Sequence, residues 1–350
     1  MLKASRALIF ALCALLGACA SLRSTSQKIG VSPDSVSYLT MAEGIAAGEG
    51  FVDVRRYSTP VRPIYPPGYP LLLAAAGLPS GDPLAASRWL NALLLAGGAA
   101  LLAWGAERAT GSLSLSLLGG VLFAVSTDLA VIYGRVWSEV FFVPLIVGYV
   151  VAMARYLEPE EQETGRRRAL LVAAACAALA VSVRYPGVAA LFAGCCVLLL
   201  PRAAPWRRRL QDALIFGALG SALLVPWLMR NVWVFGRPYL GSARSPSSFS
   251  FRQENMQRGL DLMLAWTGAP VAGLTAVLLV AVACGAASRR PAAPGRVRAM
   301  MLASFSFAAV YLGTMAIGTY VYGLNKPFDA RSFGPAYGPV LLVMLCGAAL

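Results

Sequence analysis

Acid–base chemistry in this chain would have to rely on carboxylates, because the sequence contains no histidine, the commonest general base. Two carboxylates stand out by position. Asp34 opens a predicted surface helix, where the peptide dipole favours an ionised carboxylate, and Tyr38 lies four residues on along the same face. Glu139 lies at the mouth of an apolar run, where a carboxylate is expected to be functional or paired. The structural alternatives are a helix cap for Asp34 and a salt bridge from Glu139 to Arg135.

The elements that must position these residues are mostly membrane spans. Hydrophobic residues make up 58% of the 350 residues and charged residues 13%, a composition typical of polytopic membrane proteins. Because charged side chains are costly inside a bilayer, the charged gaps between apolar runs mark the loops. We predict an all-α polytopic membrane protein of about ten transmembrane helices, forming a single domain of residues 1–350. The predicted spans are Ala7–Leu22, which could instead be a cleaved signal, Trp89–Ala106, Leu113–Tyr133, Val140–Ala154, Ala169–Val183, Tyr185–Leu200, Ala213–Met229, Leu262–Ser288, Ala299–Leu324 and Ser332–Leu350.

The longest segment that cannot lie in a bilayer is residues 23–88, which we predict to be a large first extracytoplasmic loop. Within it, Ser32 is a candidate N-cap, Pro33 occupies the first helical position and Gly48 follows about four turns later. This pattern predicts a helix over Asp34–Ala47. Its apolar residues can form one face, so we expect it to lie along the membrane surface.

Prolines shape the second half of that loop. The five prolines between Tyr57 and Pro70 predict irregular structure leading into a short apolar helix at residues 71–78. A second sizeable outer loop is predicted at residues 230–261.

The basic residues predict the orientation. With a cytoplasmic N-terminus, fifteen of the 30 lysines and arginines fall on the short inner segments, as the positive-inside rule requires. Arginines that remain on the disfavoured outer side suggest an anionic ligand there, although lipid headgroups or outer acidic residues could pair with them instead. These outer arginines are Arg55, Arg56, Arg62, Arg135, Arg184, Arg230 and Arg331.

Charge and cysteine content exclude other classes. The net charge of +14 comes largely from basic clusters between spans, and no soluble basic domain is present that would bind nucleic acid. All seven cysteines fall in apolar runs without CxxC spacing, so we interpret them as packing residues.

Five short motifs occur in order along nearly the whole chain. They are P-D-S-V-S-Y-L-T-M-A-E-G-I-A-A-G at 33–48, P-P-G-Y-P at 66–70, R-V-W-S-E at 135–139, V-P-W-L-M-R-N-V-W-V-F-G-R-P at 225–238 and D-A-R-S-F-G-P at 329–335. In this order they resemble the GT-C class of membrane glycosyltransferases, in particular the bacterial relatives of protein O-mannosyltransferases and of the lipid A aminoarabinose transferase. One departure is Ser35, because many relatives have a second acidic residue after the one that corresponds to Asp34.

The resemblance implies a glycosyltransferase in the bacterial inner membrane, with its active site on the periplasmic face. Its donor would be a sugar on a polyprenyl phosphate, its acceptor a hydroxyl of a lipid, glycan or protein, and transfer would invert the anomeric carbon. Asp34 is then the candidate base, supported by Glu139. The substrate-binding candidates are Tyr38, Arg62, Tyr69, Arg135, Lys326 and Arg331, with Arg331 as the main clamp on the phosphate.

The resemblance requires no cofactor, because the phosphate leaves as a lipid monoester, although a divalent ion held by Asp34 and Glu139 is an alternative. Outer aromatic side chains could stack on the sugar or belong to the interfacial belt; they are Tyr57, Tyr65, Tyr69, Trp137 and Tyr239. Two other functions compete: a transporter or flippase of lipid-linked glycans, and a catalytically inactive member of the same fold. Charged residues at mid-membrane and an internal repeat would favour transport, and the sequence shows neither.

Overall fold

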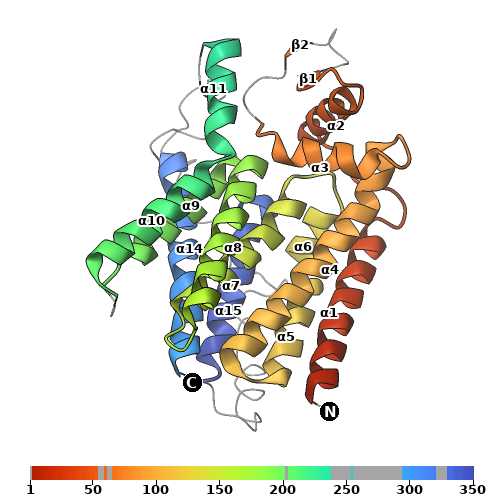
Figure 1. The fold of residues 1–350 in the computed structure, drawn as a ribbon. Helices are drawn as coiled ribbons and strands as arrows, with labels where there is room; N and C mark the ends of the chain where they lie inside the picture. The colour runs from red at the N-terminus through yellow and green to blue at the C-terminus, as the bar shows by residue number, and fades with distance from the viewer. Residues whose placement is uncertain are drawn as a thin grey trace.

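The computed structural model describes residues 2–53, 59–60, 65–201, 204–236, 238, 254, 294–320 and 329–350. Helices dominate this part of the chain (Figure 1), as the sequence predicts. They are α1 (Leu2–Ser24), α2 (Pro33–Ala46), α3 (Gly68–Gly77), α4 (Pro83–Thr110), α5 (Leu113–Ala124), α6 (Thr127–Tyr133), α7 (Glu139–Leu157), α8 (Glu163–Val183), α9 (Val188–Leu199), α10 (Trp206–Ser221), α11 (Leu224–Phe235), α14 (Pro294–Tyr320) and α15 (Ala330–Gly347). A short antiparallel pair, β1 (Val52–Asp53) and β2 (Thr59–Pro60), follows α2.

Four helices in the described residues are long and apolar enough to cross a membrane, and six spans result if each of two bent pairs counts as one. The chain is therefore a mostly helical membrane protein, while the predicted number of about ten spans is not confirmed. The predicted span Leu262–Ser288 lies outside the described residues. The other predicted spans coincide with a helix or a bent pair, but several of these helices are short.

Two predicted spans are bent rather than straight. The segment predicted as Leu113–Tyr133 divides into α5 and α6, which meet at 52°, because the Ser126 hydroxyl accepts from the Leu129 N–H and caps a new helix. The segment predicted as Ala213–Met229 bends by 47° between α10 and α11. Pro226 lies in the first turn of α11, where it lacks the N–H that would continue the preceding helix. The second helix runs to Phe235, so residues 230–235, which the sequence predicts to lie in a loop, are helical.

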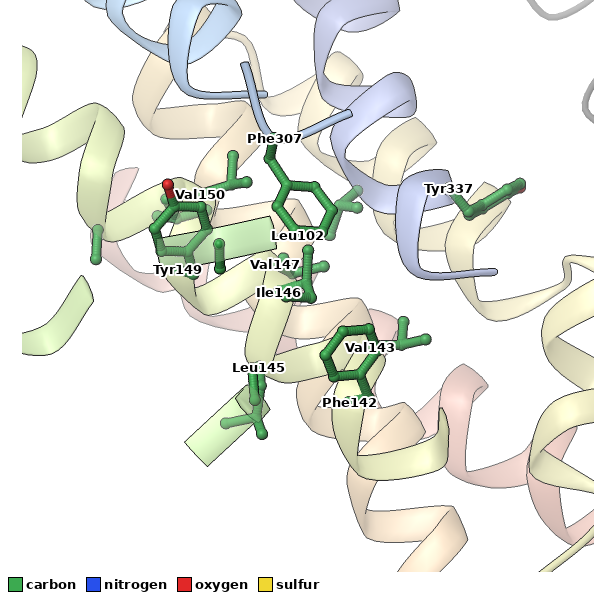
Figure 2. Close-up of a cluster of buried hydrophobic side chains, with 14 of the residues drawn as sticks. Leu102, Phe142, Val143, Leu145, Ile146, Val147, Tyr149, Val150, Phe307 and Tyr337 are labelled. Carbon is green, nitrogen blue, oxygen red and sulfur yellow. The ribbon is translucent and has the colours of Figure 1, made fainter. Parts of the chain in front are cut away.

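Helix α7 is at the centre of the bundle. Of its spanning window 72% is buried, compared with 17% for α1. Figure 2 shows its apolar side chains between Leu102 of α4, Phe307 of α14 and Tyr337 of α15, all buried. Packing of this kind fixes α7 in position and rotation, and therefore also fixes its first residue, Glu139.

The two ends of the bundle differ in character. The N-terminus and the C-terminus lie together at one end, and α2, α3 and the β1–β2 pair cover the opposite end (Figure 1). Ion pairs tie the helices together at the end that holds the termini: Arg6 pairs with Glu107 at 2.7 Å, and Arg108 pairs with Glu158 at 2.7 Å and with Glu161 at 2.8 Å. The carboxylates singled out above lie at the other end.

The helix predicted at Asp34–Ala47 is confirmed as α2. Its N-cap is Ser32 and Pro33 is its first residue, as expected, while Gly48 lies just past its end with φ of +79°. Tyr38, Met41 and neighbouring residues are buried, because α2 packs on α3 and α4. The short apolar helix predicted at residues 71–78 is α3.

Candidate active site

Asp34 lies in the first turn of α2, and both of its carboxylate oxygens are held. The Ser32 and Ser35 side chains form a reciprocal capping box, with the Ser35 N–H donating to Ser32 Oγ (3.3 Å) and the Ser32 N–H donating to Ser35 Oγ (2.9 Å). Capping therefore does not occupy the Asp34 carboxylate. Tyr65 Oη donates to Oδ1 at 3.0 Å and Arg331 Nη1 donates to Oδ2 at 2.8 Å. The Asp34 side chain remains 22% exposed.

Glu139 is the first residue of α7, and its side chain is completely buried. Two guanidinium groups compensate its charge: Arg331 Nε donates to Oε1 at 2.5 Å, and Arg184 Nη1 lies 2.5 Å from the same oxygen. The alternative of a salt bridge to Arg135 is wrong. Arg135 precedes the helix that begins at Glu139, so the two residues are not one helical turn apart.

Arg331 lies in the first turn of α15 and joins the two carboxylates. The capping box of Asp329 and Ser332 starts this helix, which places Arg331 against both Asp34 and Glu139. The fold thus brings together three residues that lie far apart in the sequence. Among the described residues, the site contains two carboxylates and, with Arg184, two guanidinium groups that pair with them.

Arg184 is a site residue that the sequence did not single out from the other outer arginines. It is the C-cap of α8, with an extended backbone, and its Nη1 also donates to Ser138 Oγ at 3.0 Å. Ser138 Oγ in turn lies 3.1 Å from Tyr38 Oη. The only sequence signal for Arg184 is that a charged residue stands where the apolar run of α8 ends.

The segment before Glu139 is held in place by its backbone. Gly30 N–H donates to the Gly134 carbonyl at 2.8 Å, and Val136 N–H donates to the Gly30 carbonyl at 3.0 Å. The buried Asn91 side chain donates to the carbonyls of Tyr133 (2.8 Å) and Arg135 (2.9 Å). A Cβ at Gly30 would lie 2.7 Å from Arg135 Cγ, so a larger residue there would push the segment away from α2.

Three tyrosine rings pack together beside α2, and one of them, Tyr65, contacts the Asp34 carboxylate. The rings of Tyr65 and Tyr69 each make an edge contact with Tyr38 at 5.1 Å. Tyr69 is fully buried and its hydroxyl has no hydrogen-bond partner among the described residues. Burial and the negative charge of Asp34 raise the pKa of Tyr65, so this hydroxyl stays protonated and continues to donate to Asp34 at alkaline pH.

The remaining predicted residues lie around this centre or outside the described structure. The Arg135 side chain is exposed, with its guanidinium carbon 4.7 Å from the centre of the Trp137 ring. Arg62 and Lys326 lie outside the described residues. Among the described residues, no group of three or more histidine, cysteine, aspartate or glutamate side chains could hold a metal ion, and Arg331 already bridges the two carboxylates of the alternative metal site.

Comparison of the sequence with family models finds a match to part of the chain. Residues 65–236 match the family described as dolichyl-phosphate-mannose-protein mannosyltransferase. The matched region contains the second and third of the five motifs, including Glu139, and most of the fourth, but begins after Asp34 and ends before Arg331. Comparison with curated proteins finds no match.

Solved structures with the same fold cover almost the whole chain. ArnT from Cupriavidus metallidurans in the apo state is 17% identical with a TM-score of 0.67, and the match covers 99% of this chain and 60% of ArnT. The same protein bound to undecaprenyl phosphate also gives a TM-score of 0.67 at 17% identity, over 98% of this chain and 59% of ArnT. The S. cerevisiae Pmt1-Pmt2 complex bound to the sugar donor gives a TM-score of 0.50 at 19% identity, over 71% of this chain and 36% of that chain. This chain therefore spans about three fifths of the ArnT structure that it resembles.

Proposed function

We propose that this chain transfers a sugar from a polyprenyl-phosphate donor to an acceptor hydroxyl. Its resemblance to the GT-C glycosyltransferases is confirmed by the mannosyltransferase family match over residues 65–236 and by its ArnT-like fold. Transfer inverts the anomeric carbon, and the acceptor is a hydroxyl of a lipid, a glycan or a protein. The chain requires no cofactor for this reaction.

The observation that supports this proposal most directly is the difference between the two carboxylates. Asp34 is 22% exposed, and one of its oxygens accepts a hydrogen bond from the neutral hydroxyl of Tyr65. An acceptor hydroxyl can therefore reach this carboxylate. Glu139 is 0% exposed and is held by two guanidinium groups. Asp34 is therefore the base, and Glu139 supports it by positioning Arg331 and Arg184.

In the proposed reaction, the acceptor oxygen attacks the anomeric carbon as its proton passes to an Asp34 oxygen. The bond between that carbon and the phosphate oxygen breaks, and the lipid leaves as a phosphate monoester. This single displacement inverts the carbon. Guanidinium groups at the leaving phosphate stabilise its growing negative charge. Arg331 contacts both carboxylates, and Arg135 contacts the same Trp137 ring as Arg331, so these two are the proposed groups. Arg62, Lys326, Tyr38 and Tyr69 are the other proposed substrate-binding residues.

The proposed topology has about ten spans, a cytoplasmic N-terminus and the site on the periplasmic face of the inner membrane. Two facts support it. Both termini lie at one end of the bundle, as an even number of spans requires (Figure 1). The basic clusters Arg166–Arg168 and Arg207–Arg209 lie near the ends of helices α8 and α10, on segments assigned to the cytoplasmic side by the positive-inside rule.

The test is turnover of radiolabelled polyprenyl-phosphate sugars by the full chain reconstituted in lipid. We expect the protein to consume one donor of such a panel and to release the polyprenyl phosphate. If the protein bound these lipids but consumed none across lipid, glycan and protein acceptors, the proposed activity would be rejected. Transbilayer movement of the same lipids would then be the next measurement.

Tyr65→Phe should lower kcat about tenfold or more, because it removes the hydrogen bond that orients Asp34. A hydrogen bond to a charged group is worth about 1.5–3 kcal/mol, and about 1.4 kcal/mol of barrier corresponds to a factor of ten. The phenyl ring keeps the edge contact with Tyr38, so KM for the donor should change little.

Tyr133→Phe is the matched control for this substitution. It also removes one hydroxyl from a buried tyrosine ring, but that hydroxyl has no hydrogen-bond partner among the described residues, and Tyr133 has no proposed role in substrate binding. We expect kcat within about twofold of the wild type. Equal losses in both variants would show that the two hydroxyls act on packing, and not through Asp34.

A further inference from the structure

We propose that Trp137 is a positioning residue that fixes the base and the phosphate-binding guanidinium groups relative to one another. This inference rests on the proposed function and adds a residue to it. The Trp137 side chain is 6% exposed and contacts three residues. Its Nε1–H donates to Ser32 Oγ at 2.8 Å, and the guanidinium carbons of Arg331 and Arg135 lie 4.3 Å and 4.7 Å from its ring centre.

The hydrogen bond to Ser32 connects Trp137 to the base. Ser32 is the N-cap of α2, and Asp34 is two residues further along the chain. The same Ser32 hydroxyl accepts from the Ser35 N–H and from the Trp137 indole. Trp137 therefore fixes the point at which α2 begins, and with it the position of the Asp34 carboxylate.

The ring contacts connect Trp137 to the two cations, which have different partners. Arg331 is paired with Asp34 and Glu139. Arg135 is exposed and forms no ion pair within the part of the chain that the structure describes, so its charge is available to a phosphate. An aromatic ring attracts a guanidinium group placed over it, and Trp137 thereby keeps Arg135 beside Arg331.

This arrangement changes the role expected for the aromatic ring. The sequence suggested Trp137 as a surface on which a sugar could stack, but the ring is buried and already carries two guanidinium groups. Loss of the ring should therefore reduce recognition of the phosphate, while recognition of the isoprenoid chain should be unaffected. An ordinary packing residue would show no such preference.

The test compares the binding of undecaprenyl phosphate and of undecaprenol, which lacks the phosphate, to the full chain in lipid nanodiscs. Trp137→Leu removes both the ring and the indole N–H, whereas Trp137→Phe removes the N–H and keeps an aromatic ring. Trp206→Leu is the matched control, because Trp206 also carries a guanidinium group, that of Arg209 at 5.3 Å, and lies at the start of α10, outside the site. Circular dichroism and gel filtration identify variants that remain folded.

We expect Trp137→Leu to weaken undecaprenyl phosphate binding about tenfold, in line with cation–π contacts to two groups, and to leave undecaprenol binding unchanged. Trp137→Phe should keep the phosphate preference within about threefold and lower kcat about tenfold through the lost bond to Ser32. Trp206→Leu should match the wild type in both measurements.

Three results would overturn the inference. In the first, Trp137→Leu keeps the phosphate preference or weakens both lipids equally, which would indicate a packing role. In the second, Trp137→Phe is folded and has the kcat of the wild type, which would exclude positioning of the base by Trp137. This result can be read even if the leucine variant does not fold. In the third, the wild type itself does not prefer undecaprenyl phosphate to undecaprenol, which would also reject the proposed donor; the first two results leave the donor assignment intact.

Discussion

Asp34→Asn is expected to lower kcat by about 10²–10⁴-fold, the range by which a positioned general base accelerates a reaction. The asparagine side chain has nearly the same shape, and its oxygen can still accept from Tyr65, but it cannot take the acceptor proton. The Arg331 guanidinium group would keep its pairing with Glu139. We therefore expect KM for the donor to change far less than kcat.

Glu49→Gln is the matched control for Asp34→Asn. Glu49 is an exposed carboxylate just beyond the other end of the same helix, so its replacement makes the same change of charge on the same face of the bundle. We expect full activity from Glu49→Gln. For both variants, kcat and KM are measured from initial rates over a range of donor concentrations. Thermal unfolding checks that each variant is folded. More than a tenth of the wild-type kcat in a folded Asp34→Asn would exclude Asp34 as the general base.

The local elements of this site could be predicted from sequence because their causes are local. Ser32, Pro33 and Gly48 lie within one segment, and they set the start and end of α2 close to where the structure has them. The positions of most apolar helices followed for the same reason, since the cost of burying charge in lipid is a property of each short stretch. The bends were missed because an apolar run looks the same whether it is straight or broken.

The partners of the charged residues could not be predicted, because they depend on how distant segments pack. Asp34 and Arg331 are separated by 297 positions, and the sequence contains nothing that ties one to the other. The sequence did name both residues, through the family resemblance, but it assigned Arg331 to the phosphate alone. Arg184 was one of seven outer arginines, and only the packing of α7 against α8 identifies it as the partner of Glu139.

The exposure of the two carboxylates also depended on the fold. From position alone, Asp34 and Glu139 were similar candidates, each at the start of a helix, and only the family resemblance made Asp34 the candidate base. In the structure, Glu139 begins the central helix α7 and is covered on all sides, whereas Asp34 begins a helix at the end of the bundle (Figure 1). Packing around α7 thus decides which of the two carboxylates is exposed.

Glu139→Gln is expected to destabilise the protein by about 3–5 kcal/mol, because removal of one partner of a buried ion pair leaves the other charge uncompensated. Here the loss affects two guanidinium groups, since both Arg331 and Arg184 lie 2.5 Å from the same carboxylate oxygen. The midpoint of thermal unfolding in detergent measures the effect. Glu163→Gln is the control: Glu163 also pairs with two arginines, Arg167 and Arg208, but its side chain is 47% exposed, so the midpoint should hardly change.

A second substitution tests whether Glu139 positions other groups or acts itself. In Glu139→Gln with Arg184→Gln, one unpaired cation is removed together with its partner, so we expect about half of the lost stability to return. If Glu139 only holds Arg331, which also pairs with Asp34, and compensates the charge of Arg184, turnover should recover with stability, to within about tenfold of the wild type. A double variant that regains its thermal midpoint but stays as inactive as Asp34→Asn would instead make Glu139 a catalytic group, because positioning would then have been restored without restoring the reaction.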